Sequence, residues 1–223
     1  MDTESGCAFI EVNSKGQNRI IVSAGTNRMY TEEYIKNVLE KAEAGDFVLL
    51  QNEINMVGEI IRLSHEKGCR VVFNASPIPG KPEELPLELV DIFMVNELEA
   101  AALAGTSTEG DFRDILKALQ KKYPKAAIVM TLGKEGVFYG YKEEFYSHPI
   151  FKVNAVDTTA AGDTFCGYFL AALCAEKSVE TALREASAAS AMAVFGQRCG
   201  TFHSGTQCGG RMALWQIIAA VFY

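Results

Sequence analysis

The amino-acid sequence predicts an α/β fold in which helices cover both faces of a mostly parallel sheet. The order of strand-like and helix-like segments along the chain predicts it. Short apolar, β-branched segments alternate with segments of helical period along most of the chain, and this βαβα order is typical of parallel sheets between helical layers. The 223 residues show no internal repeat, linker or low-complexity segment, so we expect a single domain over 1–223.

The first half of the chain is expected to form a hairpin followed by alternating helices and strands. The β-rich segments CAFIEV and RIIVSAG flank NSKGQN, whose Asn and Gly suit a tight turn. A helix should start behind the N-cap residue Thr31, because apolar residues then recur at helical spacing up to Ala42. The segments FVLLQ and RVVFN are predicted strands, and MVGEIIRLSHEKG between them is a predicted helix closed by Gly68.

The second half continues the alternation and ends in two helices. DIFMV is a predicted strand, followed by helices at Glu97–Ala104 and Asp111–Lys122 and by the strand AIVMT. The segment GVFYGYKEEFYSHPIFKVNAV predicts antiparallel strands at one edge. Helices over Gly162–Ala175 and Val179–Val194 complete the outer layer.

Composition excludes several classes of protein. A formal net charge of −7 argues against binding to a nucleic-acid backbone. The six cysteines show no CxxC pairing, which favours reduced thiols in the cytosol. No signal peptide is visible, and the longest apolar run, Met212–Tyr223, is too short to span a bilayer. We expect a soluble cytoplasmic protein without a membrane partner, able to reach the nucleus in a eukaryotic cell.

Polar residues directly follow the predicted strands. In open α/β sheets ligands bind beyond the carboxyl ends of the strands, so these residues favour one shared crevice. They are Asn52-Glu53, Asn74, Asn96, Thr131-Leu132-Gly133 and Asp157. The histidines His65, His148 and His203 are scattered along the chain, and we assign no chemistry to them.

The segment VDTTAAGDTFCGYF predicts an anion site at the start of a helix. A helix beginning near Gly162 presents unpaired backbone N–H groups, and the small residues Ala160, Ala161 and Gly162 leave them accessible. Asp163 repels a bound anion, but it can take a proton from a hydroxyl that attacks a phosphate. The alternative is that Asp163 only stabilises the helix N-terminus and the small residues only pack against the sheet.

Several motifs together resemble the PfkB/ribokinase family of sugar kinases. DTTAAGD is similar to the family's C-terminal signature, NELE to its Asn-x-x-Glu, and TLGKEGV to its nucleotide loop. VNSKGQNRIIVSAGTN, LLQNE, FNASP and QRCGT are similar to the ribokinase-type forms of further motifs, in the family's order. The resemblance covers nearly all of residues 5–204 and favours the ribokinase branch.

This resemblance implies a fold, a reaction and a set of site residues. The fold would be a ribokinase-like three-layer α/β/α sandwich, and the reaction would be transfer of the γ-phosphoryl group of ATP to the 5-hydroxyl of D-ribose. Asp163 would be the general base, and the backbone of Ala160, Ala161 and Gly162 would stabilise the transferred group. Glu53 and Asp163 would contact the sugar.

The family's nucleotide and metal sites also map onto this chain. Asn96, Thr131, Gly133, Gly136 and Gly162 would contact ATP, and Glu99 would hold Mg²⁺ through water. The residues matching the family's K⁺ site are Asp157, Thr159, Phe195, Arg198, Gly200 and Ser204. The resemblance further implies a homodimer in the full-length form.

Each of these residues has a simpler interpretation that the sequence leaves open. Asn96 could cap the following helix, with Glu99 exposed on it. Gly133 and Gly136 could only form a turn. Glu53 could be an acidic residue at the N-terminus of the next helix.

Two departures from the family lead us to expect a truncated member. The family's first strands, its di-glycine sugar motif and an Asp that binds sugar hydroxyls have no counterpart before the hairpin. Residues 205–223 form an atypical apolar tail, whose apolar residues surround a helix rather than line one face. We therefore expect missing N-terminal strands, an incomplete sugar site, and ribose phosphorylation by the isolated chain near background.

Three hypotheses on function follow. The first is the ATP-dependent ribose kinase, and the second is a catalytically impaired remnant that binds nucleotide or dimerises. The third is a kinase for another sugar, such as fructose. A dinucleotide-dependent dehydrogenase is disfavoured, because no G-x-G-x-x-G follows the first strand.

Overall fold

The computed structural model describes residues 4–12, 18–153 and 160–195 of the chain. These residues fall into two compact units, of which the first extends to Val90 and the second begins at Asp91. Each unit contributes its own strands and helices, and each is described by itself. The prediction of a single domain over 1–223 stays a prediction.

The first unit contains a hairpin and a strand–helix–strand motif. Its strands are β1 (Cys7–Val12), β2 (Asn18–Ser23), β3 (Phe47–Gln51) and β4 (Arg70–Asn74); its α-helices are α1 (Glu32–Leu39) and α2 (Val57–Glu66); short 3-10 helices lie at Gly25–Arg28, Pro82–Glu84 and Leu87–Leu89. β1 and β2 pair antiparallel, whereas β3 and β4 pair parallel with Gln51 beside Asn74. The predicted hairpin and parallel crossover are therefore confirmed.

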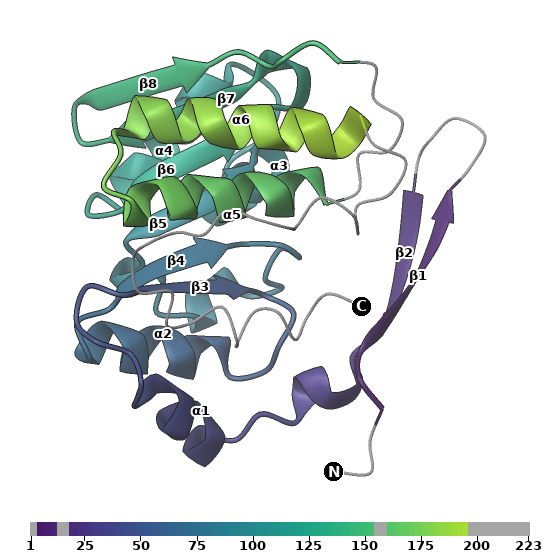
Figure 1. Cartoon of the computed structure of the whole chain (residues 1–223), viewed down its shortest axis with the longest axis vertical. Coiled ribbons are helices and arrows are strands. Elements are labelled where there is room, and N and C mark those ends of the chain that lie inside the picture. Colours follow the sequence, from purple (N-terminus) through teal and green to yellow (C-terminus); the bar gives the residue numbers. More distant parts are fainter. Residues whose placement is uncertain (1–3, 13–17, 154–159, 196–223) are drawn as a thin grey trace. The chain divides into compact units, whose positions relative to one another are not determined.

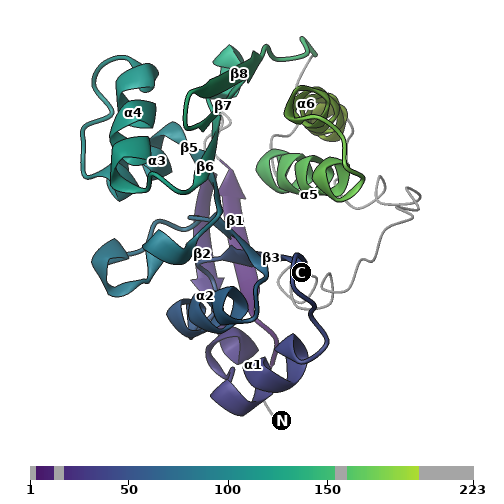
Figure 2. The ribbon, with the colours of Figure 1, turned by 90° about the vertical axis from the view of Figure 1, so that its left-hand side faces the viewer.

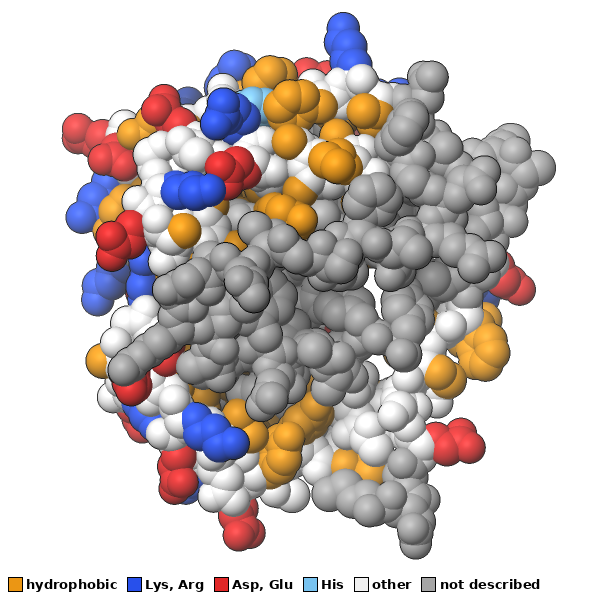
Figure 3. Space-filling model, viewed as in Figure 1, with side chains coloured by type: hydrophobic (Ala, Val, Ile, Leu, Met, Phe, Trp, Pro, Cys, Tyr) orange, Lys and Arg blue, Asp and Glu red, His pale blue; other side chains and the backbone are white. Residues whose placement is uncertain are grey.

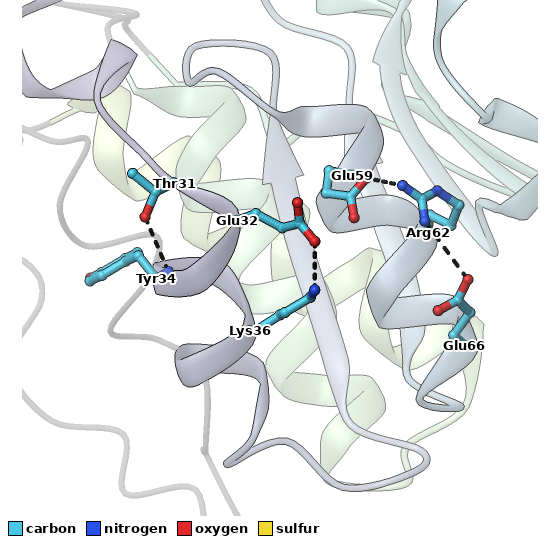
Figure 4. A network of polar contacts seen from close by, with 7 residues as sticks. All are labelled: Thr31, Glu32, Tyr34, Lys36, Glu59, Arg62 and Glu66. Atoms are coloured by element: carbon cyan, nitrogen blue, oxygen red, sulfur yellow. Dashed lines mark hydrogen bonds and ion pairs between the residues drawn. The ribbon is translucent and has the colours of Figure 1, made fainter.

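Local sequence explains where α1 begins and which side it buries. The Thr31 side chain accepts a hydrogen bond from the N–H of Tyr34 at 3.2 Å, as an N-cap residue does (Figure 4). Ile35 and Leu39 are buried on one face. The helix ends at Leu39, so the apolar pattern up to Ala42 extends beyond it. The ion pairs drawn in Figure 4 lie on exposed surface, where such pairs stabilise little.

The second unit is a three-layer arrangement. Its elements are β5 (Ile92–Asn96), α3 (Glu97–Ala104), α4 (Phe112–Lys122), β6 (Ala127–Thr131), a 3-10 helix (Gly133–Glu135), β7 (Val137–Tyr141), β8 (Glu144–His148), α5 (Ala161–Cys174) and α6 (Val179–Phe195). β5 and β6 pair parallel, and β6, β7 and β8 pair antiparallel in turn. Figures 1 and 2 show α3 and α4 on one face of these strands and α5 and α6 on the other.

Burial on both faces explains why β5 and β6 are nearly continuous apolar runs. All residues of β5 and β6 are buried except the last of each, Asn96 and Thr131. Strands covered by helices on both sides have no solvent face, so the alternation of polar and apolar residues disappears. The two residues that end these strands are polar, and the change marks the edge of the core.

The structure also bears on the predictions made for the cysteines, for membrane spans and for the apolar tail. Cys7, Cys69, Cys166 and Cys174 are free thiols, and Cys199 and Cys208 lie outside the described residues. Burial, with Asp46 nearby, raises the pKa of the Cys69 thiol. Of the helices in the described ranges, none has the length and apolar character needed to cross a bilayer. The tail 205–223 also lies outside the described residues.

Candidate active site

The N-terminus of α5 has the geometry of an anion site. Its N-cap residue, Ala160, adopts a left-handed backbone conformation (φ 57°, ψ 13°) and offers no side-chain cap. The N–H of Thr164 closes the first helical turn by donating to the carbonyl of Ala160 at 2.9 Å. The N–H groups before Thr164 have no acceptor within the helix and lie at the positive end of its dipole. An external anion can therefore take the place of a capping side chain.

Gly162 leaves open space at this helix start. It is exposed, and a Cβ added to it would meet no described atom within 4 Å. Ala160 and Ala161 are half-buried. Close packing against the sheet therefore does not explain the glycine, although it remains a sufficient reason for the two alanines. The open space lies where an anion would approach the first turn.

Asp163 lies half-buried in the first turn of α5. A carboxylate there is stabilised by the helix dipole whether or not it takes part in chemistry. The position thus suits both interpretations of the sequence, a general base beside an anion site and a helix-stabilising acid.

Asn96 and Thr131 are the last residues of two neighbouring strands, β5 and β6, and lie opposite each other in the sheet. They are paired residues in the parallel register of β5 and β6, so the fold brings them side by side. The hydroxyl of Thr131 lies 3.5 Å from the carbonyl oxygen of Val95. Two of the residues predicted to contact nucleotide therefore stand at one edge of the sheet, as the rule for open α/β sheets expects.

Asn96 and Glu99 form a capping box at the start of α3. The Asn96 side chain accepts a hydrogen bond from the backbone N–H of Glu99 at 2.9 Å, and the Glu99 carboxylate accepts one from the backbone N–H of Asn96 at 2.9 Å. The capping role considered for Asn96 is present. The idea that Glu99 is simply exposed is wrong, because its side chain is buried, with 8% exposure.

Among the described residues, the metal site predicted around Glu99 is not a cage of protein ligands. Within the described ranges, no three His, Cys, Asp or Glu side chains cluster as a direct metal cage would. Magnesium keeps several water ligands and needs few protein ligands. A buried, oriented carboxylate such as Glu99 fits a contact made through water, and this assignment stays a proposal.

The turn between β6 and β7 contains two glycines, and glycine is favoured at each position for a different reason. Both have positive φ, 49° at Gly133 and 94° at Gly136, so both form the turn that the simpler interpretation expects. A Cβ on Gly136 would lie 2.2 Å from the carbonyl oxygen of His148, so packing alone requires this glycine. Gly133 is exposed with nothing near its Cβ position, which leaves its backbone open to a ligand.

Glu53 follows β3 in the first unit and is half-buried. The preceding Asn52 is held in place, because its N–H donates to Ser76 O and its Nδ2 donates to Pro77 O, both at 3.0 Å. The idea that Glu53 is the N-terminal acid of the next helix is wrong. That helix, α2, begins only at Val57, and the acidic residue of its first turn is Glu59.

The predicted K⁺ site lies mostly outside the described residues. This holds for Asp157, Thr159, Arg198, Gly200 and Ser204. Phe195 is the last residue of α6. The potassium assignment therefore stays a prediction.

One contact at the anion site was missed from the sequence. The hydroxyl of Ser190, on α6, donates to the carbonyl of Ala161 at 3.0 Å. In the sequence Ser190 is one small residue in the alanine-rich segment ASAASAMA, 29 positions away from Ala161. No local pattern signals such a pairing.

A second missed feature is a cleft of about 420 Å³ between β8 and the start of α6. It is lined by Phe145, Tyr146, Ser147, His148, Glu180, Thr181 and Arg184, none of which was a predicted site residue. On the face shown in Figure 3, hydrophobic side chains gather over the region where Figure 1 places β8 and α6. Among the exposed apolar residues of these elements are Phe145 and Met192.

Comparison with known proteins supports one family. The sequence profile of the pfkB family carbohydrate kinase matches residues 1–204. Ribokinase of Bacillus subtilis is 39% identical over 197 residues, which are 86% of this chain and 63% of that protein. The crystal structure of ribokinase from Thermotoga maritima superposes with a TM-score of 0.75 at 33% identity, covering 89% of this chain and 66% of that one.

A further solved structure carries ligands. Arabidopsis thaliana ribokinase, complexed with ribose and ATP, superposes with a TM-score of 0.73 at 29% identity, covering 88% of this chain and 65% of that one. The predicted α/β fold with a mostly parallel central sheet is thereby confirmed. The chain spans between 57% and 63% of the length of the first curated relatives it matches.

Proposed function

Because the chain belongs to the pfkB family of carbohydrate kinases, we propose that it carries the phosphoryl-transfer site of an ATP-dependent ribose kinase. The proposed reaction moves the γ-phosphoryl group of ATP to the 5-hydroxyl of D-ribose. The observation that carries it is the uncapped, open first turn of α5, with Asp163 inside that turn.

The proposed mechanism divides the work between a base and backbone donors. Asp163 accepts the proton of the sugar hydroxyl as that oxygen attacks phosphorus. The N–H groups of the first turn of α5 donate to the phosphoryl oxygens, where negative charge is held during transfer. A carboxylate beside an anion site is poorly suited to bind phosphate, which is why we assign Asp163 to the hydroxyl.

The nucleotide is proposed to lie along the ends of β5 and β6. Asn96 and Thr131 stand side by side there, and the exposed backbone of Gly133 allows close approach. We place Glu99 at a water-mediated contact to Mg²⁺, which when bound would neutralise phosphate charge. Gly136 is proposed to support the nucleotide loop through its packing rather than through contact.

Ribose is the proposed sugar because the sequence relatives include ribokinases at 35–39% identity. The solved relative from Arabidopsis thaliana is complexed with ribose and ATP. Glu53 is our candidate for binding a sugar hydroxyl. We further propose a K⁺ requirement, a cytoplasmic location and a homodimer in the full-length form, which rest on the family resemblance.

The test is a coupled ADP-release assay on the 223-residue chain with ribose, with fructose and without sugar. Ribose-dependent ADP release above the sugar-free rate, even well below the roughly 1–100 per second typical of kinases, supports the proposal if Asp163→Asn lowers it to the rate measured without sugar. Binding of an ATP analogue, measured by calorimetry, should survive that substitution.

The contrary outcomes are distinct. Faster turnover with fructose would replace ribose by another sugar. Nucleotide binding without any sugar-dependent turnover would support the nucleotide-binding remnant instead. Ribose turnover by Asp163→Asn at the parental rate would show that the base is assigned to the wrong residue.

A further inference from the structure

The helices α5 and α6 form a hairpin that is tied at both ends. They lie side by side in Figures 1 and 2, joined through residues 175–178. At the joined end, Lys177 Nζ contacts both carboxylate oxygens of Glu185, at 2.8 and 2.9 Å. At the other end, Ser190 Oγ donates to the carbonyl of Ala161 at 3.0 Å. The first turn of α5, which forms the anion site, is therefore held by α6.

The peptide group that Ser190 contacts is also part of the anion site. The carbonyl of Ala161 and the N–H of Gly162 belong to one planar trans amide, in which the C=O and N–H bonds point in opposite directions. Holding the oxygen toward α6 therefore fixes the N–H that points out of the helix N-terminus. A hydrogen bond accepted by the oxygen also polarises the amide, so its N–H becomes a stronger donor.

We propose that Ser190 is a positioning residue that orients and polarises the Ala161–Gly162 amide for binding of a phosphoryl group. The inference rests on the proposed function, in which this helix start receives the transferred phosphate. Ser190 touches neither the sugar nor the nucleotide in this scheme and acts only through the amide.

The choice of residue type supports this role. A serine inside a helix often bonds a carbonyl of its own preceding turn, which bends the helix slightly. Here the hydroxyl reaches the neighbouring helix instead. The surrounding segment of α6 is almost entirely alanine and serine. An alanine at position 190 would fill nearly the same volume as serine, but it could not donate a hydrogen bond to Ala161.

The experiment compares Ser190→Ala and Ser190→Thr with Ser187→Ala as the matched control. Ser187 lies one turn earlier on α6, is half-buried like Ser190, and undergoes the same chemical change. Labelling alanine with ¹³C at the carbonyl and glycine with ¹⁵N reports only the four Ala–Gly peptide bonds of the chain. The Gly162→Ala variant identifies the 161–162 signal by its loss.

We expect Ser190→Ala to shift the Ala161 carbonyl and Gly162 amide resonances, whereas Ser190→Thr and Ser187→Ala keep them near their parental positions. Loss of one neutral hydrogen bond should weaken the binding of inorganic phosphate by about three- to tenfold. The kcat of ribose phosphorylation should fall by the same factor, with the KM for ribose unchanged.

Unchanged 161–162 resonances in Ser190→Ala would overturn the inference, and so would equal losses of phosphate binding in Ser190→Ala and Ser187→Ala. Failure of the proposed function looks different. In that case the parental chain shows no ribose-dependent ADP release, while the resonances and phosphate binding still depend on Ser190.

Discussion

Replacing Gly162 by alanine separates the stability of α5 from its proposed chemistry. Gly162 lies in the first turn of the helix, without positive φ, and an added Cβ would meet no described atom within 4 Å. The described residues therefore leave room for an alanine side chain. Because alanine loses less backbone entropy on folding, Gly162→Ala should stabilise the protein by roughly 0.5–1 kcal/mol. For a chain of this length, that raises Tm by about 1–4 °C.

The same methyl group should block the anion. In an α-helix each Cα–Cβ bond tilts toward the N-terminus, so the Cβ of residue 162 would project toward the space where a phosphoryl group meets the first turn. Displacing the anion from these donors should cost about as much as losing one donor of an oxyanion hole, about 10²–10³-fold in kcat. A more stable protein with much lower activity is the expected combination.

The assays are thermal unfolding, ADP release and calorimetric titration with inorganic phosphate. Gly80→Ala is the matched control, because Gly80 is exposed, has no positive φ and has nothing within 4 Å of its Cβ position. It should gain similar stability and keep parental activity and phosphate binding. If Gly162→Ala kept phosphate binding and turnover within twofold of the parent, the helix start would not be the phosphoryl site. A loss of stability would contradict the open space described at Gly162.

Three further predictions follow from the fold and the family. Gly136→Ala should lower the free energy of unfolding by roughly 1–3 kcal/mol from backbone strain alone, because its φ is 94° and its Cβ would collide with His148 O; a Tm within 1 °C of the parent would contradict this packing. Replacing K⁺ by a bulky organic cation at constant ionic strength should lower turnover, and equal rates in both buffers would count against a cation site. Asp111 is the N-cap residue of α4, and its carboxylate accepts a hydrogen bond from the backbone N–H of Arg113 at 2.9 Å. This hydrogen bond holds the pKa of the Asp111 carboxyl below its ordinary value of 3.8, so the charged cap stabilises α4 above that pH and its contribution is lost as pH falls through the lowered pKa. The Tm difference between the parent and Asp111→Ala should therefore be present at pH 7 and shrink in acid, and a difference that stays constant with pH would refute the cap's charge dependence.

The order and type of the elements could be predicted from the sequence because they depend on local patterns. The Thr31 cap, the buried runs FVLLQ and AIVMT, and the small residues before α5 act within a few positions of themselves. Helix ends were less predictable, as the early end of α1 at Leu39 shows. Apolar spacing continues past the point where the chain leaves the helix, because the next apolar residue, Ala42, is buried without being helical.

The sequence by itself therefore determined the α/β class and the family, and it predicted an anion site at the start of α5, because all three depend on contiguous motifs. Only the tertiary structure decided that Glu99 is buried, that Gly136 is required by the backbone of His148, and that Ser190 holds the amide before Gly162. Each of these depends on how the chain packs rather than on local periodicity. The last two join residues that lie 12 and 29 positions apart in the chain. Side chains that meet across helices and strands leave no periodic signal, because their neighbours along the chain do not share the contact.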